Sequence, residues 1–328
     1  MPDSDSAAPT LAQPSLSEVA AAADRIRQSV ARVIVGKDQV IDHVLVALLS
    51  EGHILLDDVP GLGKTMLAKS LAHSLGLEFR RIQFTPDLMP ADISGINIYN
   101  QKSGEFEFRA GPLLAQLVLA DEINRASPRT QSALLEAMEE RQITVEGETL
   151  MMPRPFLVIA TQNPVELEGT FPLPEAQLDR FLLRLSLGYP TPEEEDAILV
   201  RFERAQPLDE LEPVVDGPQL LALAKALEQV QVHERVRSYI VSLVQATRDE
   251  DAFDLGASPR GSLALLRTSR ALAAIRGRDY VLPDDVQEMA PAVLPHRLRL
   301  STQSRLRSGT TDSVLAEVLQ RVPVPIEA

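Results

Sequence analysis

The stretch from Ile54 to Ala68 constrains the fold more than any other part of this 328-residue chain. Its apolar start predicts a buried parallel strand, a turn with Gly61 and Gly63 follows, and apolar residues then recur with helical spacing. The amides of such a turn and of the first turn of a helix can point at one anion together. The order of strand, turn and helix therefore predicts a phosphate-binding loop.

The residue types in this loop suit ATP. Lys64 offers a mobile ammonium to the β- and γ-phosphates, and the hydroxyl of Thr65 is a ligand for Mg²⁺. The general pattern G-x-x-x-x-G-K-[ST] wants glycine where this chain has Asp58, so an ordinary strand-to-helix turn is the alternative interpretation. The predicted nucleotide-binding residues of the loop are Pro60, Gly61, Leu62, Gly63, Lys64, Thr65 and Met66.

Composition narrows the classes of function. The chain has 32 Lys and Arg against 47 Asp and Glu, and a net charge of −15 repels nucleic-acid backbones, although a local basic channel remains compatible with it. Because there are no cysteines and the five histidines lack ligand spacing, we expect no metal held by protein side chains alone. No apolar run is long enough to cross a bilayer, and no targeting signal is evident, so we expect a cytoplasmic protein.

Strands alternate with helices as far as residue 188. Residues 1–14 are predicted to be a disordered tail, and two helices, Leu16–Val33 and Asp38–Ser50, precede the first strand. Such alternation predicts an α/β core domain over 15–188, with a parallel five-stranded sheet covered by helices on both faces. Two hairpins, near 93–108 and 143–151, are expected as insertions. The expected strands are the run from Ile54, 78–84, 117–122, 156–161 and 181–187.

After a linker at 188–192 the patterns indicate helices alone. We therefore predict a second, all-α domain over 189–328. Its expected helices are about 192–205, 217–229, 233–248, 259–276, 283–291 and 311–321.

Polar residues end two of the predicted strands. Asp121 and Glu122 close an apolar strand, at the edge where open parallel sheets bind ligands. Asp121 can hold Mg²⁺ through water, and Glu122 can polarise the water that attacks the γ-phosphate. Asn163 ends the neighbouring strand and can reach the same water. The alternatives are a strand that merely ends at the surface and, for Asn163, a turn residue before proline.

Two arginines are candidates for a role in catalysis. Arg260 follows a Ser-Pro pair at a helix start, where a cation opposes the helix dipole by up to about 1 kcal/mol unless an anion is bound. We expect the nucleotide phosphate to supply that anion across the domain junction, the alternative being a solvated arginine. Arg180 could pair with Asp179 or, in a ring, reach a neighbour's γ-phosphate as an arginine finger. Arg125 and Arg129 are rival candidates.

Three longer runs resemble the MoxR family of AAA+ ATPases. They are LADEINRASPRTQ at 119–131, ATQNP at 160–164 and FPLPEAQLDRF at 171–181. The similarity extends from about residue 35 to the C-terminus, and 257–260 and 290–294 continue it through the helical domain. Such long runs are far more specific than a short motif.

The resemblance implies an AAA+ ATPase core with a C-terminal α-helical lid, assembled as a hexameric ring with ATP and Mg²⁺ between subunits. It also implies chaperone-like maturation of protein complexes, often with a von Willebrand factor A domain partner. The hairpins are similar to the helix-2 insert and the pre-sensor-1 hairpin. The implied roles are Walker A for Lys64 and Thr65, Walker B for Asp121 and Glu122, sensor 1 for Asn163, arginine finger for Arg180, sensor 2 for Arg260, and adenine contact for Val35 and Gly36.

Three positions depart from the family pattern or match it loosely. Asp58 replaces a glycine of the phosphate loop, and Pro295 stands where arginine is expected, which leaves the 296–299 patch without an assigned role. Gln83 is a loose candidate for the polar residue that restrains the catalytic glutamate.

Two other functions are weighed against the chaperone-like ATPase. A DNA-dependent motor would use the hairpins, but these carry Lys102, Arg109 and Arg154 without a dense basic run, and we do not expect nucleic acid as a partner. A nucleotide-gated scaffold with little turnover would need fewer intact catalytic positions than this chain has. Alternating aromatic residues on the first hairpin favour hairpin packing over a client site.

Overall fold

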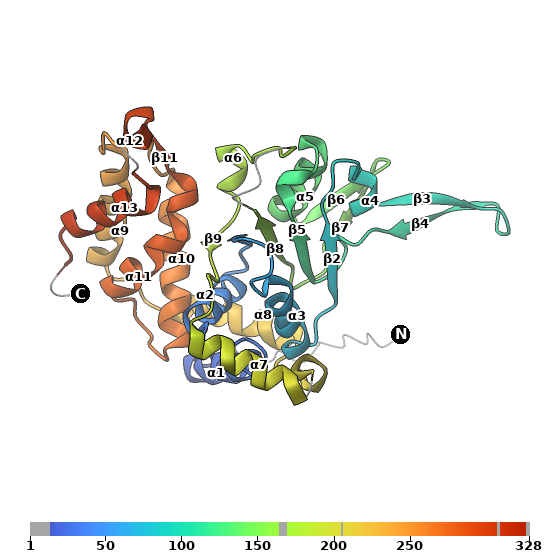
Figure 1. Cartoon of the computed structure of the whole chain (residues 1–328), viewed down its shortest axis with the longest axis horizontal. Coiled ribbons are helices and arrows are strands. Elements are labelled where there is room, and N and C mark those ends of the chain that lie inside the picture. The colour runs from blue at the N-terminus through green and yellow to red at the C-terminus, as the bar shows by residue number, and fades with distance from the viewer. Residues whose placement is uncertain (1–13, 164–168, 205, 307–308, 326–328) are drawn as a thin grey trace, which may run out of the picture.

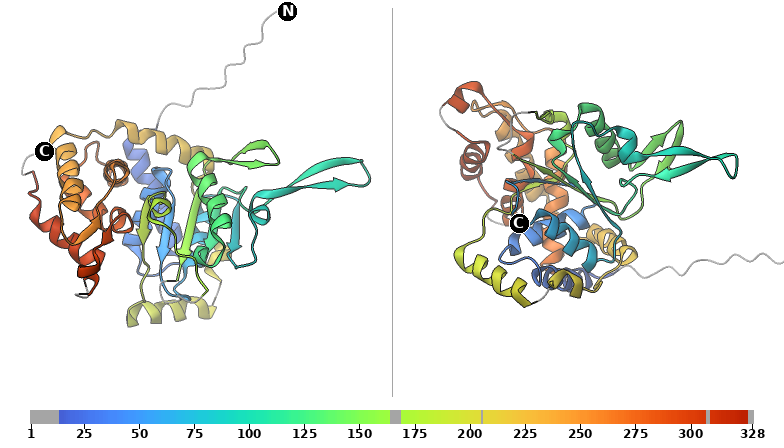
Figure 2. Two further views of the ribbon diagram at one scale, coloured as in Figure 1. Left: turned by 90° about the horizontal axis from the view of Figure 1, so that it is seen from above. Right: turned by 45° about the vertical axis from the view of Figure 1, so that its right-hand side comes forward.

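The computed structural model describes residues 14–163, 169–204, 206–306 and 309–325 (Figure 1). The predicted tail at 1–14 lies almost wholly outside these residues. A central sheet has helices on both faces, a helical lid lies on one side of it, and two hairpins project on the other (Figures 1 and 2). No helix of the described residues is both long and apolar enough to span a membrane.

The sheet confirms the α/β prediction. Its five strands are all parallel in the order β2-β5-β8-β1-β9. The carboxyl ends of neighbouring strands lie level, because Gln83 pairs in register with Asp121, and Asp57 with Gln162. Polar residues from four strands therefore share one edge. The strands are β1 (Ile54–Asp57), β2 (Phe79–Gln83), β5 (Leu117–Asp121), β8 (Leu157–Gln162) and β9 (Leu183–Leu185).

The apolar runs of the central strands are explained by burial on both faces. Ile54 and Leu56 of β1 pack into the core cluster that also holds the N-terminal helices, whereas Leu55 packs into the cluster on the other face. The first face is covered by α1 (Leu16–Ala31), α2 (Asp38–Leu49) and α3 (Lys64–Ser74), and the second by α5 (Pro128–Glu140). Near-continuous apolar strands are typical of such a sandwich.

The first hairpin starts later than we predicted. Ile93 belongs to a short helix, α4 (Pro90–Ser94), because Pro90 opens a helical turn and Asp92 accepts a hydrogen bond from the Met89 amide at 2.8 Å. The side chain of Ile93 is fully buried. The hairpins themselves are β3 (Gly95–Asn100) with β4 (Glu105–Ala110), and β6 (Gln142–Val145) with β7 (Glu148–Met151).

The lid is not purely helical, so the expectation of helices alone was wrong in detail. Strands β10 (Phe253–Leu255) and β11 (Arg299–Leu300) form a short antiparallel pair. Phe253 and Leu300 face each other in this pair, and both side chains belong to the buried core. The lid helices are α9 (Glu234–Arg248), α10 (Pro259–Ile275), α11 (Pro283–Val293), α12 (Thr302–Leu306) and α13 (Thr311–Arg321).

Two helices after the linker lie against the N-terminal helices. Helix α8 (Gly217–Ala226) contacts α1 and α2, and Arg201 of α7 (Pro192–Arg204) donates to the Ala31 carbonyl at 2.7 Å. Helix α10 of the lid also packs on α1 and α2. The domain division at residue 189 stays a prediction. The remaining short helices are α6 (Glu175–Leu178), η1 (Ile123–Arg125), η2 (Pro207–Glu210), η3 (Leu227–Gln229) and η4 (Pro295–Arg297).

Candidate nucleotide-binding site

The phosphate loop joins β1 to α3. Gly61 and Gly63 have φ angles of 88° and 91°, a left-handed conformation that glycine adopts without the strain a side chain adds. The ammonium of Lys64 folds over the loop and donates to the carbonyls of Asp58, at 2.6 Å, and Val59, at 3.0 Å. These neutral acceptors hold Lys64 at the loop, within reach of an incoming phosphate.

Asp58, which replaces the first glycine of the general pattern, fastens the loop to the end of β9. Its buried carboxylate accepts hydrogen bonds from the Ser186 hydroxyl at 2.6 Å and from the Leu187 amide at 2.7 Å. The departure from the pattern therefore has a structural purpose. No local sequence signal could have shown it, because the partners lie far along the chain.

Asp121 is held from both sides at the end of β5. One carboxylate oxygen accepts from the Thr161 hydroxyl and the other from the Arg81 guanidinium, each at 2.6 Å. Together with the hydroxyl of Thr65, Asp121 offers the oxygen donors that Mg²⁺ prefers, and Mg²⁺ is usually bound by one or two such ligands plus substrate phosphates. The described residues contain no cluster of three or more His, Asp or Glu side chains that could hold a metal ion.

Glu122 is restrained by Gln83, the loose candidate of the sequence analysis. The Gln83 amide nitrogen donates to Glu122 Oε2 at 2.7 Å, and Arg125 Nε lies 3.2 Å from the same oxygen. Arg81 donates to the Gln83 amide oxygen at 2.7 Å, which fixes the orientation of that amide. Glu122 itself has a φ of 58°, a left-handed backbone conformation that ends the strand after Asp121.

Most of the predicted site residues line one cavity of about 330 Å³. It also contains Arg81, Thr161 and Gln162, which the sequence analysis did not assign to the site. Thr161 could have been found as a polar residue near the end of an apolar strand. No sequence signal pointed to Arg81. The predicted residues at this cavity are Pro60, Gly61, Gly63, Lys64, Thr65, Met66, Asp121, Glu122 and Asn163.

The segment predicted to contact adenine does not line this cavity. Gly36 has a φ of 68°, and a β-carbon there would come within 2.0 Å of Glu194 Oε1. Lys37 pairs with Glu194 at 3.3 Å. Gly36 therefore lies against the start of α7, and the contact of Val35 and Gly36 with adenine stays a prediction.

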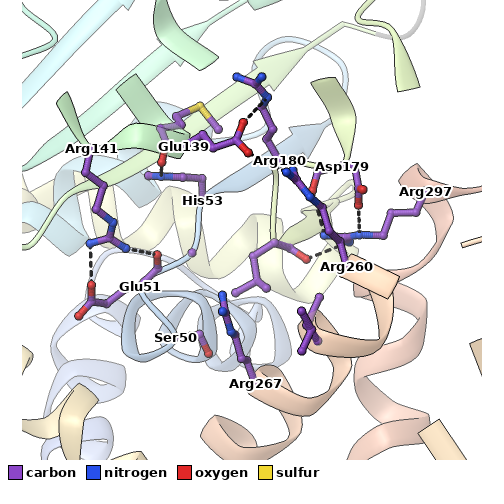
Figure 3. Close-up of a pocket in the computed structure, with 15 residues that line it drawn as sticks. Ser50, Glu51, His53, Glu139, Arg141, Asp179, Arg180, Arg260, Arg267 and Arg297 are labelled. Carbon is purple, nitrogen blue, oxygen red and sulfur yellow. Dashed lines mark hydrogen bonds and ion pairs between the residues drawn. The ribbon is translucent and has the colours of Figure 1, made fainter. Parts of the chain in front are cut away.

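Arg180 and Arg260 line a second cavity, of about 380 Å³, that shares no residue with the first (Figure 3). Arg180 pairs with Glu139 at 3.0 Å, not with Asp179 as the alternative interpretation expected. Arg260 also pairs with Glu139, at 2.7 Å, and this contact raises the pKa of Arg260. The structure thus does not bring Arg260 to the phosphate loop of its own chain. Arg125 lies instead at Glu122, and Arg129 is exposed at the start of α5.

The patch after Pro295 lies in the junction between core and lid. Arg297 is buried and donates to Asp179 at 2.8 Å and to the Phe181 carbonyl at 2.7 Å. His296 Nε2 lies 3.0 Å from the same carbonyl, and burial lowers the pKa of His296 well below its ordinary value. This patch therefore joins the lid to the segment that carries Arg180.

Comparison with known proteins agrees with this architecture. Residues 53–183 match the ATPase family associated with various cellular activities (AAA), and residues 245–318 match the AAA lid domain. "Chaperone MoxR1" of Mycobacterium tuberculosis is 46% identical over 90% of this chain and 80% of its own length. The chain belongs to the MoxR family of AAA+ ATPases.

Other relatives support the same MoxR assignment. "Protein MoxR" of Methylorubrum extorquens is 30% identical over 93% of this chain and 95% of its own length. "Uncharacterized protein YeaC" of Bacillus subtilis is 50% identical over 90% and 92%. A crystal structure of a proposed ATPase from Cytophaga hutchinsonii superposes with a TM-score of 0.88 at 38% identity, covering 94% of this chain and 97% of that one.

Proposed function

We propose that this MoxR protein hydrolyses ATP, with Mg²⁺, at sites shared between the subunits of a hexameric ring, and that turnover remodels or matures protein complexes. The observation that supports a shared site is the separation of the two cavities. One chain presents the phosphate loop and the acidic pair in the first, and presents Arg180 and Arg260 in the second. The first cavity has the phosphate loop without these arginines, and the second has the arginines without a phosphate loop.

The roles of the first cavity follow from its contacts. Lys64 and the loop amides bind the phosphates. Thr65 would supply an oxygen ligand for Mg²⁺ and Asp121 would hold the ion through water, and the ion would neutralise phosphate charge. Glu122 and Asn163 orient the attacking water once Glu122 is released from Gln83. Thr161 and Arg81 hold Asp121 in the position where that work is done.

The second cavity supplies cations to a neighbouring copy. Stabilising the negative charge that develops on a transferring phosphoryl group is the established use of an arginine supplied from another subunit. Because Arg260 shares a carboxylate with Arg180, both arginines would act on the same neighbouring phosphate. This replaces our expectation that Arg260 acts across the domain junction of its own chain.

Protein remodelling rests on the relatives. One of them is named a chaperone, and rings are the common assembly of AAA+ proteins. A von Willebrand factor A domain protein is the proposed partner. The DNA-motor alternative gains no support, because Glu105 and Glu107 on β4 and Glu146 and Glu148 on the second hairpin oppose the few basic residues there.

Complementation tests the shared site. We expect Lys64→Ala and Arg180→Ala to be nearly inactive alone, because each lacks one half of every site. In an equal mixture of the two variants, about a quarter of the interfaces join an intact phosphate loop to an intact Arg180. ATPase activity should therefore recover to about a quarter of the wild-type value. Arg125→Ala and Arg129→Ala, mixed with Lys64→Ala in the same way, serve as matched tests of the rival arginines. ATPase activity that stays at the sum of the separate variants would contradict a shared site.

A further inference from the structure

Glu139, near the end of α5, joins two arginines that come from different parts of the chain (Figure 3). Its Oε2 lies 3.0 Å from Arg180 Nε, on the segment between α6 and β9. Its Oε1 lies 2.7 Å from Arg260 Nη2, on the first turn of α10. Each oxygen of one carboxylate thus holds one guanidinium group.

The other acids at this cavity are already engaged. Glu51 pairs with Arg141 and Arg154, and Asp179 pairs with Arg297. Among the described residues at this cavity, Glu139 is therefore the one carboxylate that forms ion pairs with Arg180 and Arg260, and the three groups together keep one positive charge.

A third arginine increases this excess. Arg267 lies two helical turns after Arg260 on α10, so both project from the same face of the helix, and Arg267 also lines the cavity. Within the part of the chain that the structure describes, the side chain of Arg267 has no hydrogen bond or ion pair. The cavity thus carries positive charge that an incoming anion can neutralise.

The paired groups are accessible to such an anion. The exposed fractions of the side chains are 31% for Glu139, 30% for Arg180 and 54% for Arg260. The phosphate loop of the same chain lines a different cavity, so the anion has to come from another molecule. Under the proposed function, that anion is the γ-phosphate bound by a second copy.

We propose that Glu139 is a positioning residue, a resident anion that holds Arg180 and Arg260 together as one clamp and releases both to the γ-phosphate of the neighbouring copy. This inference rests on the shared site of the proposed function. Without Glu139, two like charges would repel each other, and each long side chain would sample many rotamers before the phosphate arrives. Because the Glu139 carboxylate can be replaced by the γ-phosphate, the two arginines are already positioned before ATP binds and can still transfer to the phosphate.

Kinetics of Glu139 variants test the clamp. Glu139→Gln keeps the shape but loses the charge, so we expect kcat to fall about ten-fold through misplaced arginines while KM for ATP changes less than about two-fold. Glu139→Asp keeps the charge and should recover part of kcat. The matched control is Glu140→Gln, which removes the same charge from the next, exposed residue of α5 and should leave kcat unchanged. Equal kcat for Glu139→Gln and Glu140→Gln would overturn the proposal.

A double-variant comparison separates positioning from a merely structural role. In an Arg180→Ala, Arg260→Ala background there is nothing left to position, so Glu139→Gln should cause no further loss in single-turnover hydrolysis. A further ten-fold loss in that background would show that Glu139 acts through the fold and would overturn the proposal. Thermal unfolding of each variant checks the fold, and Glu139→Asp carries the test if Glu139→Gln unfolds.

The failure of this inference differs from the failure of the proposed function. If Arg180→Ala is impaired and is rescued by Lys64→Ala, whereas Glu139→Gln turns over like wild type, the clamp alone is wrong. If Arg180→Ala itself turns over like wild type, the shared site is wrong and the clamp fails with it.

Discussion

The carboxylate of Asp179 receives two contacts from the lid, and the shorter of them is its ion pair with Arg297, at 2.8 Å between Oδ1 and Nε. The second contact comes from the hydroxyl of Ser258, which lies 3.0 Å from Oδ2 and caps α10. Asp179 directly precedes Arg180, and Ser258 lies two residues before Arg260. One carboxylate therefore links the two segments that carry the arginines of the second cavity.

Loss of the Asp179 charge should destabilise the junction. In Asp179→Asn, Arg297 stays buried without its counter-ion, and we expect a loss of about 3 kcal/mol in the free energy of unfolding. Asp254→Asn, at an exposed position of β10, is the matched control and should change little. Urea unfolding measures both. Equal stability of the two variants would show that Arg297 finds other acceptors.

Glu122→Gln should bind ATP but hydrolyse it about 100-fold more slowly, because an amide cannot polarise the attacking water. Binding depends on the loop residues, which the substitution does not touch. Steady-state ATPase assays and fluorescent-nucleotide titration measure the two properties separately. Normal turnover in this variant would remove Glu122 from the catalytic role.

Gln83→Ala should raise basal turnover. The hydrogen bond from Gln83 restrains Glu122, and a bond to a charged acceptor contributes about 1.5 kcal/mol, which corresponds to a gain of up to about ten-fold in rate. The same substitution should have no effect in a Glu122→Gln background. A fall in turnover would mean instead that Gln83 helps to orient the catalytic carboxylate.

Protonation of His53 should make the fold less stable in mild acid. Its Nδ1 accepts from the Val158 amide at 3.0 Å, its Nε2 lies 3.1 Å from the Met138 carbonyl, and burial lowers its pKa from 6.5 to about 4. The unfolded chain takes up this proton near pH 6.5 and the folded chain only near pH 4. The stabilisation is therefore complete above pH 6.5 and is lost as the pH falls toward 4.

The expected loss from this one residue is about 2 kcal/mol between pH 7 and pH 5. His53→Gln can still accept and donate but does not titrate, so its stability should fall less over that interval. His73→Gln, at an exposed position, should behave like wild type. Urea unfolding at the two pH values measures these differences. Equal pH dependence of wild type, His53→Gln and His73→Gln would contradict the assignment of this loss of stability to His53.

Local patterns were enough to place many elements and much of the first cavity. The phosphate loop and the acidic pair are each contiguous in the chain, and the strand that ends just before Asn163 is indicated by its continuous apolar run. Errors arose where a local signal competed with packing. Ile93 continues the alternating pattern of the hairpin, but it lies in a short helix that Pro90 starts, and its side chain is buried. Strands β10 and β11 have too few residues to show an alternating hydrophobic pattern in the sequence.

The sequence by itself determined the family, the α/β core and the residues of the phosphate loop, because backbone conformation and apolar periodicity act over a few neighbouring residues. Only the tertiary structure decided the contacts of charged groups: Gln83 with Glu122, Asp58 with the end of β9, and Glu139 with both Arg180 and Arg260. Which charged groups pair depends on which segments lie close together in the fold. The order of the strands and the position of the lid decide that. That information lies in the packing of the whole chain, and the separation of the arginines from the phosphate loop follows from it.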